Sequence, residues 1–78
     1  MENKKTEFQK RLEILMIMRD VSNEKLAEVI GVNKSSISNY KSTEGRMPSL
    51  ESIIKMADYF GVTIDFLLGR TGDVLLRM

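Results

Sequence analysis

The sequence has 78 residues, 42% hydrophobic and 29% charged, with a formal net charge of +1, which predicts one small globular domain rather than a disordered chain. It contains neither cysteine nor histidine, which excludes disulfides and thiolate sites and removes the commonest general base and metal ligand. Because the first residues are charged and every apolar run is short, we expect no signal peptide, no membrane span and a cytoplasmic location.

The first predicted helix covers about residues 5–19. Its apolar residues recur at helical spacing, which places Phe8, Leu12, Leu15 and Met16 on one face. This face is expected to pack on the rest of the domain.

A second helix is predicted after Ser22, whose hydroxyl is typical of a helix N-cap. Leu26, Ala27 and Ile30 share the inward face of this helix. Gly31 is expected to end it, because glycine readily adopts the left-handed conformation found just beyond helix C-termini.

The third predicted helix, residues 34–41, follows Asn33, which we expect to be its N-cap. Only Ile37 and Tyr40 face inward, so most of this helix is polar. A loop is expected at residues 42–48, which contain a glycine and the one proline of the chain.

Two further helices are predicted in the second half of the chain. Ser49 caps the fourth helix, and Gly61 ends it. Thr63 caps a short fifth helix at residues 64–68, which ends at Gly69. The apolar residues expected to face inward from the fourth helix are Leu50, Ile53, Ile54, Ala57 and Phe60.

The expected fold class is therefore all-α, with one domain at residues 1–69 and a C-terminal tail at residues 70–78. The residues between the second and third helices indicate how these two meet. Ala27 is small enough for a close crossing, Gly31 permits a tight turn, and Val32 fills the corner. This pattern predicts two short helices that cross at a steep angle.

The block "SNEKLAEVIGVNKSSISNYK", followed by "MPSLESIIKMADYFGVTIDFLLG", resembles the helix-turn-helix segment of the Cro/C1-type transcriptional regulators. The resemblance covers about residues 8–69. It implies a five-helix, lambda-repressor-like fold, with the helix-turn-helix at the second and third helices. It also implies a regulator, most often a repressor, that binds double-stranded DNA with the third helix in the major groove.

The resemblance assigns base contacts to Lys34, Ser35 and Asn39, because the family reads bases from these positions of the third helix. Lys34 can donate to guanine, and the Asn39 amide can pair with adenine. Asn23 stands where the family commonly has a glutamine that binds phosphate. The expected contacts to the DNA backbone are Asn23, Lys25, Asn33, Ser36, Ser38, Lys41, Ser42 and Arg46.

This chain departs from the family at two positions that are commonly an ion pair. Many relatives carry arginine at the position of Met16 and glutamate at the position of Lys41. Since both partners are replaced here, no unpaired charge is left behind. We expect Met16 to pack beneath the third helix and Lys41 to face phosphate.

The sequence leaves alternatives to DNA binding open. Residues 34–39 alone would also suit an ordinary solvated helix, and the same fold could be a protein-interaction module such as an antitoxin or co-regulator. Catalysis is not expected, because no serine or threonine has a candidate base and no glycine-rich loop can hold phosphates. We also expect no cofactor, no metal and no small-molecule ligand.

One such domain offers few base contacts, so a homodimer on a pseudo-palindromic operator is expected. Candidate apolar contacts lie on the first helix (Ile14, Ile17, Met18), and the resemblance adds Met47, Thr63 and Phe66. The tail carries a further apolar group. It can fold back on the first helix, cross to the second subunit, or remain unattached. The apolar tail residues are Val74, Leu75, Leu76 and Met78.

Overall fold

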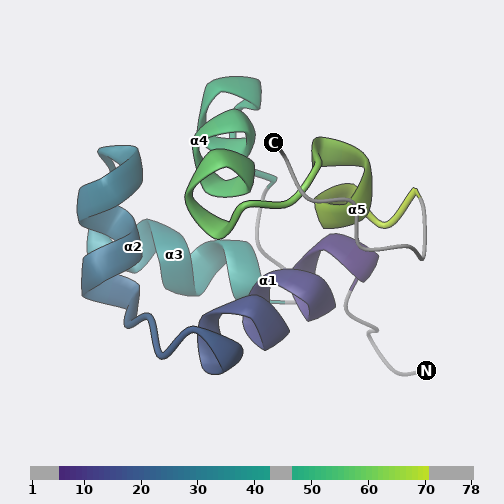
Figure 1. The fold of residues 1–78 in the computed structure, drawn as a ribbon. Helices are drawn as coiled ribbons and strands as arrows, with labels where there is room; N and C mark the ends of the chain where they lie inside the picture. Colours follow the sequence, from purple (N-terminus) through teal and green to yellow (C-terminus); the bar gives the residue numbers. More distant parts are fainter. Residues whose placement is uncertain (1–5, 43–46, 71–78) are drawn as a thin grey trace, which may run out of the picture.

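The computed structural model describes residues 6–42 and 47–70, which form five helices and no β-strand (Figure 1). The all-α prediction is therefore confirmed. Arg46 and residues 71–78, for which we predicted DNA and tail contacts, lie outside the described residues. The helices are α1 (Glu7–Met18), α2 (Asn23–Ile30), α3 (Lys34–Lys41), α4 (Leu50–Phe60) and α5 (Ile64–Leu68).

Hydroxyl side chains begin four of these helices. At α1 the cap is Thr6, whose hydroxyl accepts from the backbone N–H of Gln9 while the Gln9 side chain accepts from the backbone N–H of Thr6. The predicted caps Ser22, Ser49 and Thr63 each accept from a backbone N–H three residues later. These interactions satisfy N–H groups that have no partner within the helix.

Three helices end as predicted at left-handed glycines, with φ of 77° at Gly31, 72° at Gly61 and 81° at Gly69. The chain leaves α1 differently, because Asp20 adopts a positive φ of 54° in place of glycine. Aspartate tolerates this conformation better than most residues. The sequence offered no comparable signal for this turn.

All five helices contribute to the core, and the inward faces predicted for α1, α2 and α3 are confirmed. The predicted face of α4 is wrong in part. Leu50 is 68% exposed and Ile54 is 38% exposed, whereas Met56 is fully buried. The buried apolar residues of α4 are Ile53, Met56, Ala57 and Phe60. They have the predicted helical spacing, but the set begins at Ile53 and not at Leu50.

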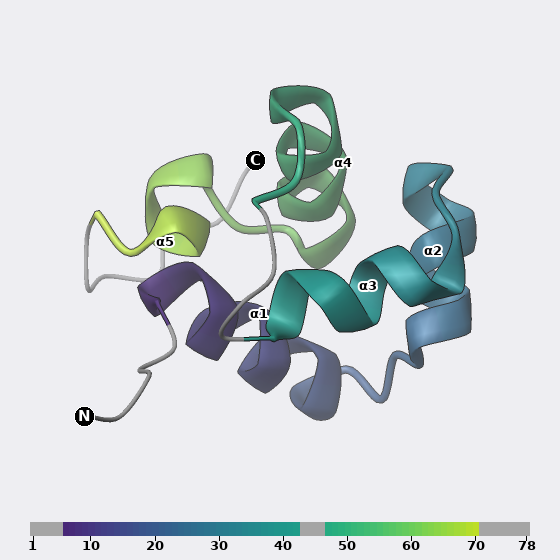
Figure 2. The same cartoon turned by 180° about the vertical axis from the view of Figure 1, so that it is seen from behind.

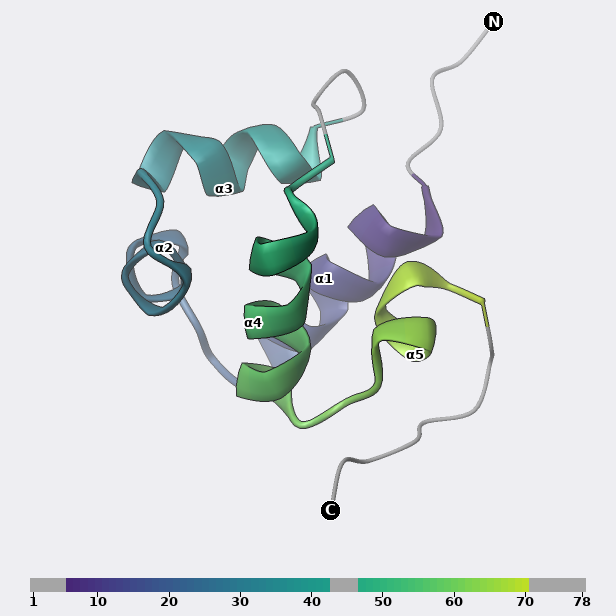
Figure 3. The ribbon, with the colours of Figure 1, turned by 90° about the horizontal axis from the view of Figure 1, so that it is seen from above.

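The helices place two surfaces on opposite sides of the bundle. Figure 3 shows α3 on one side and α5 on the other, with α1 and α4 between them. Helix α3 packs against α2 and α1, and α5 packs against α1 and α4.

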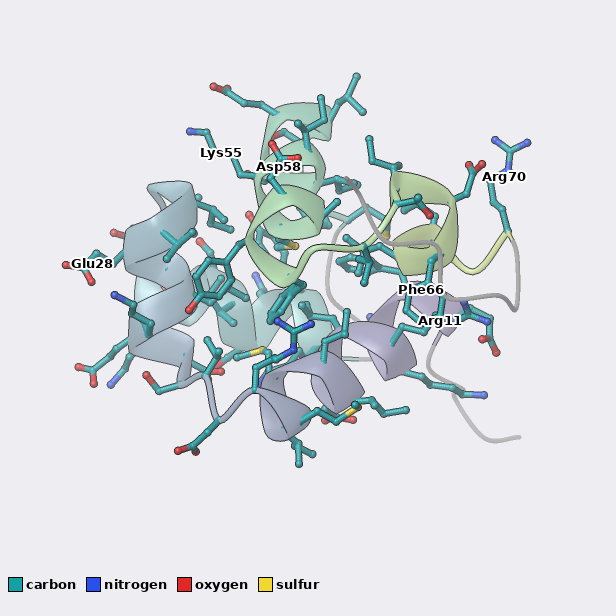
Figure 4. All side chains as sticks on the ribbon, in the orientation of Figure 1. Arg11, Glu28, Lys55, Asp58, Phe66 and Arg70 are labelled. Atoms are coloured by element: carbon teal, nitrogen blue, oxygen red, sulfur yellow. The ribbon has the colours of Figure 1, made fainter. Side chains whose placement is uncertain are left out.

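Arg11 of α1 and Arg19, the residue that follows this helix, join it to the second half of the chain. Arg11 donates from Nη1 to the carbonyl of Phe66 at 2.8 Å, and its guanidinium lies 4.5 Å from the centre of the Phe66 ring (Figure 4). Arg19 donates from Nη2 to the carbonyl of Phe60 at 2.9 Å. Arg11 is therefore a structural contact between α1 and α5.

Candidate nucleic-acid interface

The turn between α2 and α3 contains Gly31 and Val32, and both have the predicted roles. The backbone N–H groups of Gly31 and Val32 both donate to the carbonyl of Ala27, at 2.8 and 3.0 Å, which closes the end of α2. Val32 then packs against the core, and α3 begins at Lys34. Figures 2 and 3 both show α2 and α3 at a steep angle to each other, as predicted.

Helix α3 presents one narrow apolar stripe to the protein. Ile37 is fully buried, and Tyr40 is half-buried against the core. The three residues assigned to base contacts, Lys34, Ser35 and Asn39, are all exposed. Since the side chains at 35 and 39 are four residues apart, they lie on the same face of the helix.

Three of the predicted phosphate-binding residues are brought together at one end of this surface. Lys41 donates from Nζ to Oδ1 of Asn23 at 2.7 Å, and Asn23 donates from Nδ2 to Oγ of Ser38 at 3.1 Å. This network joins the first residue of α2 to the last turn of α3. The positions were predicted as a set, but the hydrogen bonds between them were not.

The buried side of the same region agrees with the expectation for Met16. This side chain is 4% exposed and lines a shallow hollow with Asn23 and Lys41. Lys41 is half-buried and lines the same hollow, so a lysine and an apolar side chain stand at the two positions of the ion pair common in the family.

Two other cations of this surface are next to acidic side chains. Lys34 Nζ lies 3.9 Å from the carboxylate of Glu24, and Lys25 Nζ lies 3.8 Å from that of Glu28. All four side chains are more than half exposed, so each pair contributes at most about 1 kcal/mol and can exchange for another partner. The Glu24–Lys34 contact was not predicted.

The two ends of α3 are held in ways the sequence did not indicate. Asn33 occupies the N-cap position, but within the described helix its side chain makes no capping hydrogen bond, so the predicted side-chain cap is wrong. The first turn is instead closed by the backbone, where Ser36 N–H donates to the Asn33 carbonyl at 2.9 Å. The exposed Asn33 amide is thus not engaged in a cap.

At the other end, Gln9 of α1 donates from Nε2 to the backbone carbonyl of Ser42. Gln9 is 5% exposed and was not singled out in the sequence. The available sequence signal was an amide next to Phe8 of the apolar face. A polar group buried at such a position is almost always hydrogen-bonded. This bond ties Ser42, the C-cap residue of α3, to α1.

Residues 6–42 and 47–70 also bear on metal binding and on membrane insertion. These residues contain no group of histidine, cysteine, aspartate and glutamate side chains placed to hold a metal ion. None of their helices combines the length and the apolar character needed to cross a bilayer.

Comparisons with known proteins agree with this geometry. A model of the helix-turn-helix family matches residues 12–67. The chain is 36% identical over 63 residues to the uncharacterized HTH-type transcriptional regulator YobD of Bacillus subtilis, which covers 81% of this chain. It is 35% identical over 72 residues to the transcriptional activator BcrR of Enterococcus faecalis, covering 92% of this chain.

The cryptic phage CTXphi transcriptional repressor RstR of Vibrio cholerae is 40% identical over 45 residues, which cover 58% of this chain. The matched regions span 55%, 34% and 39% of the lengths of YobD, BcrR and RstR. Among solved structures, a transcriptional regulator from Listeria innocua superimposes with a TM-score of 0.75 and 31% identity, covering 87% of this chain and 63% of the other. The chain belongs to the helix-turn-helix family of Cro/C1-type transcriptional regulators.

Proposed function

We propose that this chain is a repressor that binds a pseudo-palindromic operator as a homodimer, with α3 in the major groove. The observation that carries the proposal is the division of α3 into a buried stripe at Ile37 and an exposed polar face. Short hydroxyl and amide side chains on that face can reach base edges without crowding the groove. In this arrangement Lys34, Ser35 and Asn39 read bases.

The backbone contacts surround this face. Asn23, Lys41 and Ser38 form a connected polar group at one end of α3, and Lys25 lies on the neighbouring helix. On DNA, the cations of this surface exchange exposed carboxylates for phosphates, a replacement that costs little because the original ion pairs are weak. The remaining proposed contacts are Asn33, Ser36, Ser42 and Arg46.

A dimer follows from the small number of base contacts in one domain. Three side chains give too little discrimination against the many competing sites of a genome, and symmetry doubles that number. Two copies of α3 would then enter half-sites about 34–36 Å apart on one face of the duplex. Repression requires only that the bound dimer block access to its operator, whereas activation needs an additional contact with the transcription machinery.

The proposal is tested by measuring affinity for DNA from upstream of the chain's own gene across a range of salt concentrations. Each phosphate contact contributes about −0.9 to the slope of log K against log salt, so a steep slope is expected. Footprinting would show two related half-sites, sedimentation would give the mass of two chains on the operator, and a promoter–reporter assay would show lower transcription.

The second candidate is a protein-interaction module on the same fold. Several large apolar side chains favour it, because they are exposed on α1 and α4, among them Ile17 at 76% and Leu50 at 68%. A flat salt response, or equal affinity for all DNA sequences, would support this candidate and contradict the proposed repressor.

A further inference from the structure

An apolar groove lies between α1 and the segment that joins α4 to α5. Its walls carry aliphatic and aromatic side chains, and Ile14 and Met18 are 54% and 71% exposed. The residues lining the groove are Arg11, Ile14, Leu15, Met18, Arg19, Val62 and Phe66. Exposed side chains of this kind on a small domain are typical of a surface that another segment covers.

The groove is separate from the surface assigned to DNA. None of its lining residues belongs to α2 or α3, and Figure 3 shows α3 on the side of the bundle opposite α5. A segment bound in the groove therefore leaves α3 accessible.

The described chain ends near the start of α1, the helix that forms one wall of the groove. α5 stops at Gly69, which lies so close to Glu7 at the start of α1 that an added Cβ would collide with the Glu7 side chain. From this point an extended chain reaches about 20 Å in six residues. The α1 helix from Glu7 to Met18 is about 18 Å long, so residues 71–78 are long enough to follow it.

The order of side chains in the tail also matches the order along α1. Asp73 comes first, and the apolar group Val74, Leu75 and Leu76 follows it. Along α1, the guanidinium of Arg11 comes first and the exposed Ile14 and Met18 follow. A tail running parallel to α1 would thus place its carboxylate near a cation and its leucines near exposed apolar side chains.

We propose that residues 71–78 dock in this groove of their own chain. Because the tail is tethered at Arg70, two residues after α5, whose Phe66 lines the groove, its effective concentration there is in the millimolar range. A second copy is a poorer occupant, since the groove has seven lining residues whereas a stable interface has about 20 or more on each side.

The test uses the chain's lack of cysteine. A nitroxide label is attached to Arg77→Cys in chains carrying ¹³C-labelled methionine methyl groups, and the signal of the Met18 methyl is recorded. We expect this signal to be lost through relaxation by the label. The matched control carries a diamagnetic analogue of the label at the same Arg77→Cys, and the Met18 signal should then persist.

A mixed sample separates docking within one chain from docking between two. Spin-labelled chains without ¹³C are combined with ¹³C-labelled chains without the nitroxide, and the Met18 signal should then remain. Loss of the signal in the mixed sample would assign the tail to a second copy. No loss in either sample would show that the tail does not occupy the groove. Either result overturns the proposal.

Leu75→Asp in the spin-labelled chain should restore the Met18 signal while the helical circular dichroism spectrum is unchanged. No DNA is present, so the result is independent of the proposed function.

Discussion

The ammonium group of Lys41 lies 2.7 Å from the side-chain oxygen of Asn23, which is 18 residues earlier in the chain. This contact orients the Asn23 amide, because an oxygen that accepts from Lys41 leaves Nδ2 to donate to Ser38. Lys41 therefore has two roles at the proposed interface. It supplies positive charge, and it positions a second residue assigned to phosphate.

The first prediction concerns this pair. Lys41→Ala should weaken binding to operator and to random DNA alike, and should make the salt slope shallower by about 0.9 for each subunit bound. Because Lys41 also orients Asn23, the loss in Lys41→Ala combined with Asn23→Ala should be smaller than the sum of the two single losses. The measurement is a double-mutant cycle on DNA affinity at several salt concentrations.

Lys55→Ala is the matched control for that cycle. Lys55 is on α4, pairs with Glu51 at 3.6 Å and belongs to no predicted contact, so its removal should leave the salt slope unchanged. Strictly additive losses for Lys41 and Asn23 would mean that the hydrogen bond between them does not position the amide for phosphate.

The second prediction concerns base reading. Asn39 is exposed on α3, and its amide can make two hydrogen bonds to adenine. Asn39→Ala should weaken operator binding by about 1–3 kcal/mol per half-site and leave binding to random DNA nearly unchanged. Competition titrations with operator and scrambled duplexes measure both quantities. Equal losses on the two duplexes would move Asn39 to the group of backbone contacts.

The third prediction compares two glycines with the same backbone conformation and different surroundings. Gly31 and Gly69 have φ of 77° and 81°, a region that costs a residue with a side chain roughly 1–2 kcal/mol. An added Cβ meets nothing within 4 Å at Gly31, whereas at Gly69 it collides with Glu7. Gly69→Ala should therefore lower the free energy of unfolding more than Gly31→Ala, as measured by urea denaturation.

Truncating Glu7 distinguishes the collision from the backbone cost. In a Glu7→Gly background no Cβ is present at position 7, so the excess penalty of Gly69→Ala over Gly31→Ala should largely disappear. An excess that survives in this background would show that contact with Glu7 is not its cause.

Much of this fold could be predicted because local chemistry determines it. Hydroxyl caps at Ser22, Ser49 and Thr63 and the left-handed Gly31 act within a few residues of their own position, and each has the predicted role. The exposed polar face of α3 was also predictable, since Ile37 and Tyr40 are the apolar residues that can anchor it.

Contacts between distant segments were beyond the same reasoning. Gln9 reaches Ser42 across 33 residues, and Arg11 reaches Phe66 across 55, so their partners depend on how the helices pack. Arg11 contacts a carbonyl and an aromatic ring, but its residue type alone does not distinguish it from a solvated charge. The Asn23–Lys41 hydrogen bond was missed for the same reason, although both residues were assigned to one surface.

The α4 helix shows how an ambiguous periodicity produces an error, and it carries the last prediction. Leu50, Ile53, Ile54 and Met56 are all apolar, so more than one face satisfies helical spacing. In the structure the face that carries Met56 is turned inward: Met56 is fully buried, whereas Ile54 is 38% exposed. Met56→Ala should therefore lower the free energy of unfolding by about 2–5 kcal/mol, and Ile54→Ala by less than about 1 kcal/mol, in urea denaturation. Similar losses for the two variants would contradict this orientation, because they would require Ile54 to be buried as deeply as Met56.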